Sequence, residues 1–131
     1  MNYLLPAAKQ ALLESRVDWR SDPVYCVLVN TGTYTFSLAH ASLADLPPWA
    51  RIATSGTLVN RSTTNGVADA NDITFSNVTG PVASALAIFN GTGESSLYMV
   101  YVDQADGLPV SPNGTPLTVV WDNGTRRIFA L

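Results

Sequence analysis

Short apolar segments alternate with turn residues along most of this chain. Runs of strand length occur at 24–29, 82–89 and 97–103, and clusters of Gly, Asn, Asp and Pro separate them from their neighbours. Such segments are typical of antiparallel strands joined by tight turns. The run at 24–29 is apolar at nearly every position, which favours a central strand. The turn residues at 90–93 predict a hairpin between 82–89 and 97–103, although the alanines of 82–89 leave a helix as an alternative.

Weaker signals predict further strands. The Thr-rich stretch 52–64, with Leu58 and Val59 at its centre, indicates an exposed or edge strand. Shorter strands are expected at 67–71, 73–75, 117–121 and 128–131. The last of them reaches the final residue, so we expect the C-terminus to be built into a sheet. Seven or eight strands without an internal repeat predict one all-β domain over 1–131, a two-sheet antiparallel β-sandwich of jelly-roll type with one short N-terminal helix.

The strand at 97–103 is expected to be covered on both sides. Strict alternation places Tyr98 and Val100 on one face and Met99 and Tyr101 on the other, and both faces are apolar. We expect the second sheet to cover one face and a neighbouring subunit to cover the other. The small residues of 82–89 are expected to let the facing sheet approach closely.

The N-terminal segment, residues 1–20, carries the helix. A helix is expected over 1–15, because most of these residues are good helix formers and Pro6 stands near a first turn, where its missing N–H does no harm. Its apolar stripe is short. We expect the segment to cover an open end of its own domain or to dock as an arm on a partner, and its residues 2–5 to be removable without unfolding the domain.

A long loop is expected over 36–50. Within it, Ser42 is a plausible N-cap for a short turn at 43–46, which Pro47 and Pro48 end. Trp49 is expected to pack this connection onto the body of the domain, because a tryptophan side chain has a large apolar area to bury.

Composition narrows the classes of function. Apolar residues make up 47% of the 131 residues and charged residues only 13%, about half the ~25% typical of soluble domains. With so few charges, the chain must present an uncharged polar or apolar surface, which suits a subunit that is covered by its neighbours. The net charge of −3 and the lack of a basic run argue against nucleic-acid binding. The single thiol, Cys26, lies in an apolar run, where a buried and inert side chain is expected.

No apolar run approaches the ~20 residues of a membrane span, and the first residues lack the layout of a signal peptide. We therefore expect synthesis in a cytoplasm and no contact with a membrane. The five Asn-x-Ser/Thr triplets then indicate turns rather than glycosylation sites.

Residue patterns for catalysis and metal binding are weak. His40 is the only histidine, and Ser37, Ser42 and Asp45 near it do not form a recognisable nucleophile motif, so a hydrogen bond within the loop is expected for His40. The acidic cluster at 69–72 lacks the calcium-loop spacing and is expected to cap its own turns, and the stretch 103–107 is expected to end a strand in a turn. We predict no enzyme activity, no catalytic residue, no cofactor and no metal site.

Three stretches resemble one known family. They are Val27–Phe36 followed by His40, then Asn65–Phe75, and a tail that contains Gly107–Gly114, Trp121–Gly124 and Ile128–Leu131. In this order they are similar to a family of small virion structural proteins of tailed bacteriophages. Within that family the chain looks most like a capsid cement (decoration) protein, a small jelly-roll subunit on the outside of the head that bridges major capsid protein subunits.

The resemblance implies localisation on the outer surface of the virion capsid, with the major capsid protein as partner. For the oligomeric state we expect a homodimer on two-fold positions. Exposed strand edges are expected to be available for pairing with a partner. The expected contact residues come from the N-terminal segment and the long loop: Tyr3, Leu4, Leu5, Phe36, His40, Leu43, Leu46 and Trp49. The alternatives are a neck, tail or baseplate adaptor and, more remotely, a carbohydrate-binding adhesin that uses exposed Trp or Tyr.

Overall fold

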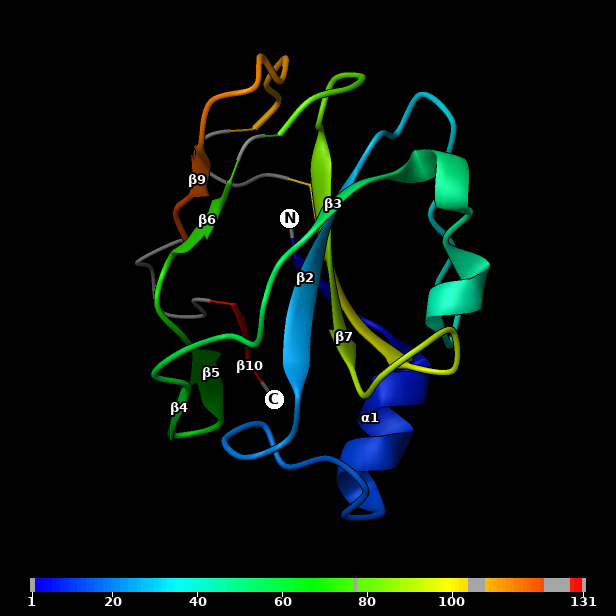
Figure 1. The fold of residues 1–131 in the computed structure, drawn as a ribbon. Coiled ribbons are helices and arrows are strands. Elements are labelled where there is room, and N and C mark those ends of the chain that lie inside the picture. Colours follow the sequence, from blue (N-terminus) through cyan, green and yellow to red (C-terminus); the bar gives the residue numbers. More distant parts are fainter. Residues whose placement is uncertain (1, 77, 104–107, 122–127, 131) are drawn as a thin grey trace.

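The computed structural model describes residues 2–76, 78–103, 108–121 and 128–130, and the fold is all-β with one α-helix among these residues (Figure 1). The helices are α1 (Pro6–Leu13) and two 3-10 turns, η1 (Leu43–Asp45) and η2 (Pro48–Ala50). The strands are β1 (Asn2–Leu4), β2 (Val24–Val29), β3 (Arg51–Thr54), β4 (Ser62–Thr64), β5 (Val67–Asp69), β6 (Ile73–Phe75), β7 (Ala85–Asn90), β8 (Leu97–Val102), β9 (Leu117–Val119) and β10 (Phe129–Ala130).

The strands form three antiparallel sheets. A five-stranded sheet has the order β1-β8-β7-β2-β3, and two smaller sheets have the orders β10-β5-β4 and β6-β9. The predicted hairpin between β7 and β8 is confirmed, because these strands pair in antiparallel register from Leu86↔Val102 to Asn90↔Leu97. β2 is central, as its continuous apolar run predicts, and it pairs with β7 along its whole length.

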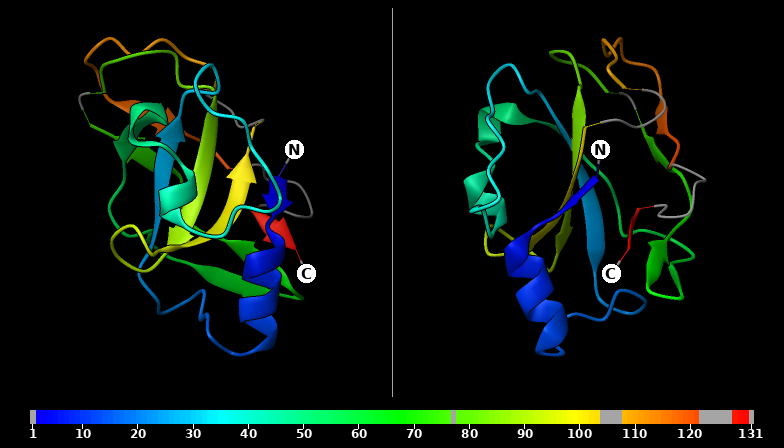
Figure 2. Two further views of the ribbon diagram at one scale, coloured as in Figure 1. Left: turned by 90° about the vertical axis from the view of Figure 1, so that its right-hand side faces the viewer. Right: turned by 180° about the vertical axis from the view of Figure 1, so that it is seen from behind.

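Both faces of the five-stranded sheet are covered within this chain (Figures 1 and 2). The two smaller sheets cover one face, and a buried cluster that includes Cys26, Leu28, Ile88, Phe75 and Val119 fills the space between them. The loop that contains η1 and η2 covers the other face, over a second buried cluster. The buried thiol expected for Cys26 is confirmed, and burial raises its pKa well above the ordinary value.

The N-terminus differs from the prediction of one helix over 1–15. Residues 2–4 form β1, which pairs antiparallel with β8, and the helix begins only at Pro6. The residue before a proline is restricted to extended backbone, and Leu5 accordingly has φ −69° and ψ 146°. The helix covers its own domain, because Ala8 and Ala11 are buried.

The stretch 52–64 lies at sheet edges, as predicted, because β3 and β4 are edge strands of their sheets, but it does not form one continuous strand. It contains two short strands, β3 and β4, and Leu58 between them is buried rather than exposed. The described residues form ten strands where seven or eight were predicted, because several loops contain strands of only two or three residues. Ala130 belongs to β10, but Leu131 and the predicted turns at 104–107 and 122–124 lie outside the described residues.

The prediction of strict alternation along β8 is wrong. The pairing register of β7 and β8 shifts between Ile88 and Phe89, which is the signature of a β-bulge. Met99 and Val100 therefore belong to the cluster beneath the smaller sheets, whereas Tyr98 and Tyr101 belong to the cluster beneath the loop.

In the described part of the chain, no helix has the length and apolar character needed to cross a membrane.

Candidate functional site

The loop that covers the second face of the five-stranded sheet is the most distinctive surface feature of the fold. Tyr34, Leu43, Leu46 and Ala50 are buried beneath it and pack against the sheet. The chain itself thus supplies the cover that was expected from a neighbouring subunit. Ala85 and Ala87 of β7 lie in this same cluster, so these small side chains admit the loop and not the facing sheet.

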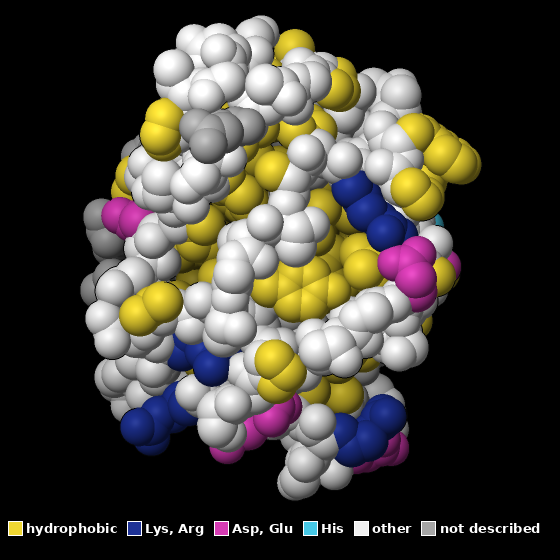
Figure 3. All heavy atoms as spheres, viewed as in Figure 1, with side chains coloured by type: hydrophobic (Ala, Val, Ile, Leu, Met, Phe, Trp, Pro, Cys, Tyr) yellow, Lys and Arg dark blue, Asp and Glu magenta, His cyan; other side chains and the backbone are white. Residues whose placement is uncertain are grey.

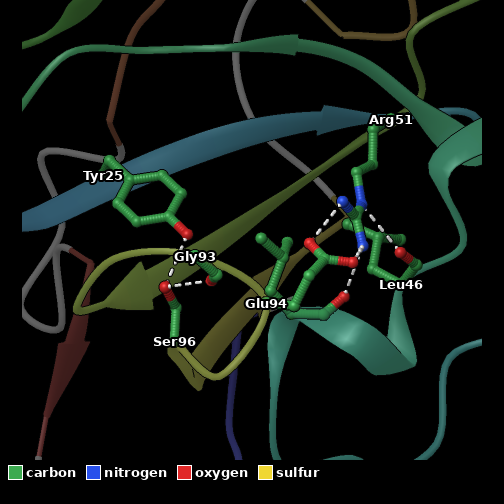
Figure 4. Close-up of polar contacts among 7 residues, drawn as sticks. Tyr25, Leu46, Arg51, Gly93, Glu94 and Ser96 are labelled. Carbon is green, nitrogen blue, oxygen red and sulfur yellow. Dashed lines mark hydrogen bonds and ion pairs between the residues drawn. The ribbon is translucent and has the colours of Figure 1, made fainter.

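Backbone hydrogen bonds attach the start of the loop to the β7–β8 hairpin. Leu43 N–H donates to Ser96 O (3.0 Å), and Tyr98 N–H donates to Ala41 O (2.9 Å). Ser96 is itself buried; its hydroxyl donates to Gly93 O (2.7 Å) and accepts from the Tyr25 hydroxyl (2.9 Å), as Figure 4 shows. The loop is therefore anchored to a turn whose own geometry is fixed.

Asp45 closes the first 3-10 turn. Its carboxylate accepts hydrogen bonds from the backbone N–H groups of Ala41 (2.8 Å) and Ser42 (3.1 Å). These two bonds stabilise the ionised form and hold the pKa of Asp45 below its ordinary value. Ser42 is the N-cap residue of η1, as predicted, and the turn ends at Asp45.

A single arginine braces the far end of the loop (Figure 4). The Arg51 guanidinium donates to Leu46 O (2.8 Å) and to Leu43 O (2.9 Å). It also donates to both carboxylate oxygens of Glu94, at 2.8 and 3.0 Å. The side chain of Arg51 is 19% exposed and that of Glu94 is 60% exposed. The hydrogen bond from Arg51 is the main cause that lowers the pKa of Glu94.

This brace has a geometric basis. A guanidinium presents several N–H groups in a planar fork, so one side chain can satisfy two carbonyls and a carboxylate at once. The two carbonyls belong to η1 and to the residue after it, and the carboxylate belongs to the β7–β8 turn. Arg51 therefore fixes the loop to the sheet from the side.

Trp49 stands outside this packed loop. It is 70% exposed, whereas Leu46 and Ala50 on either side of the Pro47-Pro48-Trp49 segment are completely buried. The prediction that Trp49 packs the loop onto the body is wrong, because these smaller neighbours occupy the inward positions of the turn. The Arg51 guanidinium bonds to Leu46 O before this turn, and Asn30 N–H donates to Ala50 O (3.0 Å) at its end, so the turn that carries the indole is held at both ends.

Beneath the loop, three polar aromatic side chains form a hydrogen-bonded chain. The Tyr34 hydroxyl lies 2.8 Å from Nδ1 of His40 and 3.0 Å from the Tyr98 hydroxyl. Burial raises the pKa of Tyr34 to about 12 and raises the pKa of Tyr98 still further, so both phenols are neutral at physiological pH. The predicted loop hydrogen bond of His40 is confirmed, and its partner is Tyr34.

The side chains of Ser37 and Asp45, which are near His40 in the sequence, bond to the backbone of the loop. Ser37 Oγ accepts from Ala39 N–H at 3.1 Å, and Asp45 accepts from the backbone as described above. The contacts found for these side chains are thus those of a folded loop.

The candidate contact residues fall into two groups. Leu5 and Leu46 are completely buried and Leu43 nearly so, which removes them from any surface of the folded chain. Partly exposed or exposed residues are Tyr3, Leu4, Phe36, His40 and Trp49. Phe36 stacks on Tyr101 with ring centroids 4.2 Å apart, and Tyr3 lies 5.4 Å from Phe36, so these rings mainly join β1 to the loop.

Removal of residues 2–5 is no longer expected to be harmless. It would delete β1, expose the edge of β8 that β1 covers, and remove Leu5, whose N–H donates to Met99 O (2.9 Å). The structure thus brings the N-terminal segment and the loop together but leaves Trp49 as the predicted residue that is most available to a partner.

The acidic cluster at 69–72 has a structural role. Asp72 accepts from Trp121 N–H (3.0 Å), and Asn71 O accepts from the Trp121 indole N–H (2.9 Å). Asp72 therefore tethers the segment that follows β9. The prediction that it caps its own turn is wrong. Within the ranges that the structure describes, no group of three or more His, Cys, Asp or Glu side chains is placed to hold a metal ion.

An open groove of about 720 Å³ lies between residues 18–21 and 57–61. Its lining includes Arg20 and Arg61 together with Asp18. The Arg61 guanidinium donates to the Asp22 carbonyl, so part of this lining serves to hold the loops together. The mixed charges single out no class of ligand.

Sequence reasoning missed Arg51 and Glu94. They are separated by more than forty positions, and neither belongs to a motif. The weak available signal was the position of Arg51 at the end of a loop and of Glu94 in a predicted hairpin turn.

No known family model matches this chain, and a search of curated proteins gives no significant match.

Proposed function

We propose that this protein is a structural subunit of a tailed-bacteriophage particle, a cement protein that binds the outside of the head and bridges major capsid protein subunits. The starting point is the resemblance of its three sequence stretches to small virion proteins. The observation that supports it most directly is the display of Trp49, 70% exposed, on a turn that is fixed at both ends.

An exposed tryptophan on a rigid turn is well suited to anchoring a protein contact. Tryptophan is enriched among the residues that contribute most to binding, and a fixed turn loses little conformational entropy on association. The surrounding loop carries little charge: Arg51 and Glu94 neutralise each other, and the Asp45 carboxylate is bonded to the backbone N–H groups of the loop. A low-charge apolar contact of this kind is compatible with a densely packed capsid surface.

Cementing results from the thermodynamic linkage between subunit binding and shell assembly. A subunit that binds the assembled shell, and not its free components, stabilises the shell by mass action. Contacts that are individually modest add up when each subunit touches more than one capsid protein. As part of the same proposal, the five-stranded sheet and the two smaller sheets form a sandwich of jelly-roll type, which would act as a rigid platform for the loop.

The test is the occupancy of purified particles by Trp49→Ala. We expect the variant to remain folded, because the indole is mostly exposed, and to lose most of its binding to heads that lack the wild-type protein. Leu13→Ala is the matched control, since Leu13 is 84% exposed on α1. Normal occupancy by Trp49→Ala would overturn the role of the turn.

Copy number separates the proposed head location from an adaptor. A cement protein is present in many copies per particle, whereas a neck, tail or baseplate adaptor is present in few. The band intensity of this protein relative to the major capsid protein, on a gel of purified virions, distinguishes a cement protein from an adaptor. Glycan binding by the isolated chain, abolished in Trp49→Ala, would instead favour the adhesin.

A further inference from the structure

One edge of the five-stranded sheet is open, and the other is covered. β1 forms the first edge, and it packs against β10 of a smaller sheet. β3 forms the opposite edge, and none of the described strands pairs with its outer side. Figure 3 faces this open edge and shows a strip of backbone and polar atoms with apolar side chains exposed on both sides of it.

The open edge is longer than β3 itself. Ser55 N–H donates to Cys26 O (2.8 Å), and Leu58 N–H donates to Val24 O (2.8 Å), so the chain continues alongside β2 beyond Thr54. Other free edges among the described strands, such as those of β4 and β6, belong to strands of three residues. A long exposed edge is the kind of feature that recruits another strand.

The direction of its free hydrogen-bonding groups follows from the register. Ser55 N–H donates to Cys26 O and Cys26 N–H donates to the Ser55 hydroxyl, so these two residues form a bonded pair, and the next pair along the strands is Val27 with Thr54. In an antiparallel pair, bonded and non-bonded positions alternate, so the N–H and C=O of Thr54 point away from β2. Beyond Ser55 the regular alternation ends, because Gly56 O accepts from the Ser55 hydroxyl (2.7 Å) and the next bond to β2 comes from Leu58, so Thr54 is the position whose free groups the register assigns.

We propose that this edge pairs with the same edge of a second copy of this chain, in antiparallel orientation about a two-fold axis. A two-fold contact places each residue near its own copy, so an unpaired charge on the edge would face a like charge. Residues 52–58 contain no charged side chain, and Arg51 at its beginning is paired with Glu94 of its own chain. The edge is therefore electrostatically compatible with itself.

The pairing has a geometric consequence. The two-fold axis between antiparallel neighbours is perpendicular to the sheet, so two five-stranded sheets join into one ten-stranded sheet and both copies keep the same face up. Both loops, each with its Trp49, then lie on one side of the dimer. A dimer with two anchors on one side is suited to bridging two capsid subunits. This consequence rests on the proposed function, whereas the pairing itself does not.

The experiment measures the mass of the purified chain by analytical ultracentrifugation up to about 1 mM. We expect the wild type to reach the mass of two chains of 14.0 kDa. Thr54→Pro removes the outward N–H of Thr54 and breaks no hydrogen bond to β2. Thr54→Lys places a positive charge from each copy near the two-fold axis. Each is expected to raise the dissociation constant of the dimer at least about tenfold. Thr63→Lys on the exposed β4 is the control and should dimerise normally.

A mixing experiment tests the two-fold arrangement directly and does not depend on the proline variant folding. Thr54→Lys and Thr54→Asp should each be monomeric alone and should form a mixed dimer when combined. A wild-type chain that stays monomeric, or Thr54 variants that dimerise as well as wild type, would overturn the pairing. A monomeric chain that still occupies phage heads would refute the pairing and leave the proposed function intact, whereas a dimer absent from particles would do the reverse.

Discussion

Both faces of the five-stranded sheet are buried, but they are covered in different ways. On one face, strands of the smaller sheets contribute apolar side chains to a broad core. On the other face, a loop with two 3-10 turns covers the sheet with a few buried side chains, among them Leu43, Leu46 and Ala50. The first cover depends on packing area, whereas the second combines modest packing with a small set of polar contacts.

The two covers therefore have different roles: one stabilises the domain, and the other holds an exposed tryptophan in a fixed position. The core beneath the smaller sheets holds the domain together, because a large buried apolar area is the dominant favourable term in folding. The loop contributes less area, but Arg51, Asp45 and Tyr34 fix its conformation through hydrogen bonds. A fixed loop can hold an exposed tryptophan in one place, which a mobile loop could not.

The largest expected effect compares one leucine from each face. Leu28→Ala removes a completely buried side chain from the strand-covered core and is expected to lower the free energy of unfolding by about 3–5 kcal/mol. Leu46→Ala, on the loop side, is expected to cost about 2–3 kcal/mol, because the loop can settle into the space left behind. Chemical denaturation measures both, and an equal or reversed order would contradict the assignment of the main core to the strand-covered face.

The next effect concerns the brace. Arg51→Ala leaves two loop carbonyls and the Glu94 carboxylate without their donor, with an expected loss of about 1–3 kcal/mol. Amide exchange in 43–50 should accelerate more than exchange in β2 and β7. Arg51→Lys should rescue little, because an ammonium group cannot reproduce the planar fork.

The matched control for the brace is Arg16→Ala. Arg16 forms an ion pair with Glu14 at 2.8 Å, but both side chains are largely exposed. Such pairs contribute between about 0 and 1 kcal/mol. If Arg16→Ala destabilised the chain as much as Arg51→Ala, the special role of Arg51 would be refuted.

The smallest effect is a response of the loop to acid. The pKa values of Asp45 and Glu94 are lower in the folded chain than their ordinary values of 3.8 and 4.5. Their stabilising contribution is therefore complete above these ordinary values and is lost as the pH falls through the lowered folded values. Amide exchange in 43–50 should accelerate in this acid range before exchange in the sheet does.

Asp45→Asn sharpens the test, because it keeps an acceptor oxygen for the backbone but cannot titrate. This variant should show a weaker acid response in the loop. Simultaneous loosening of the loop and the sheet in the wild type would contradict a loop that is held separately by its polar contacts.

The central strands were predictable because their patterns are local. The apolar run of 24–29 and the Asn-Gly turn before 97–102 set strand type and neighbour from adjacent residues alone. The bulge in β8, which leaves Met99 unpaired opposite Ile88 and Phe89, was not predictable in this way, because an irregular pairing depends on two strands and their covers at once. One extra residue was enough to move Val100 to the opposite face.

The candidate site was predictable only in outline. The boundaries of the long loop and the N-cap at Ser42 follow from turn residues. The inward or outward direction of Trp49 does not, since it depends on Leu46 and Ala50 filling the inner positions. The brace between Arg51 and Glu94 joins residues that are distant in the sequence, and no periodicity points to it.

The most direct test of the central claim is an image reconstruction of the purified phage particle that carries this protein. We expect its density at many equivalent positions on the outer surface of the head, between major capsid protein subunits, with the Trp49 turn directed at a capsid subunit. Density confined to the neck, tail or baseplate, or a particle that lacks the protein, would contradict the account.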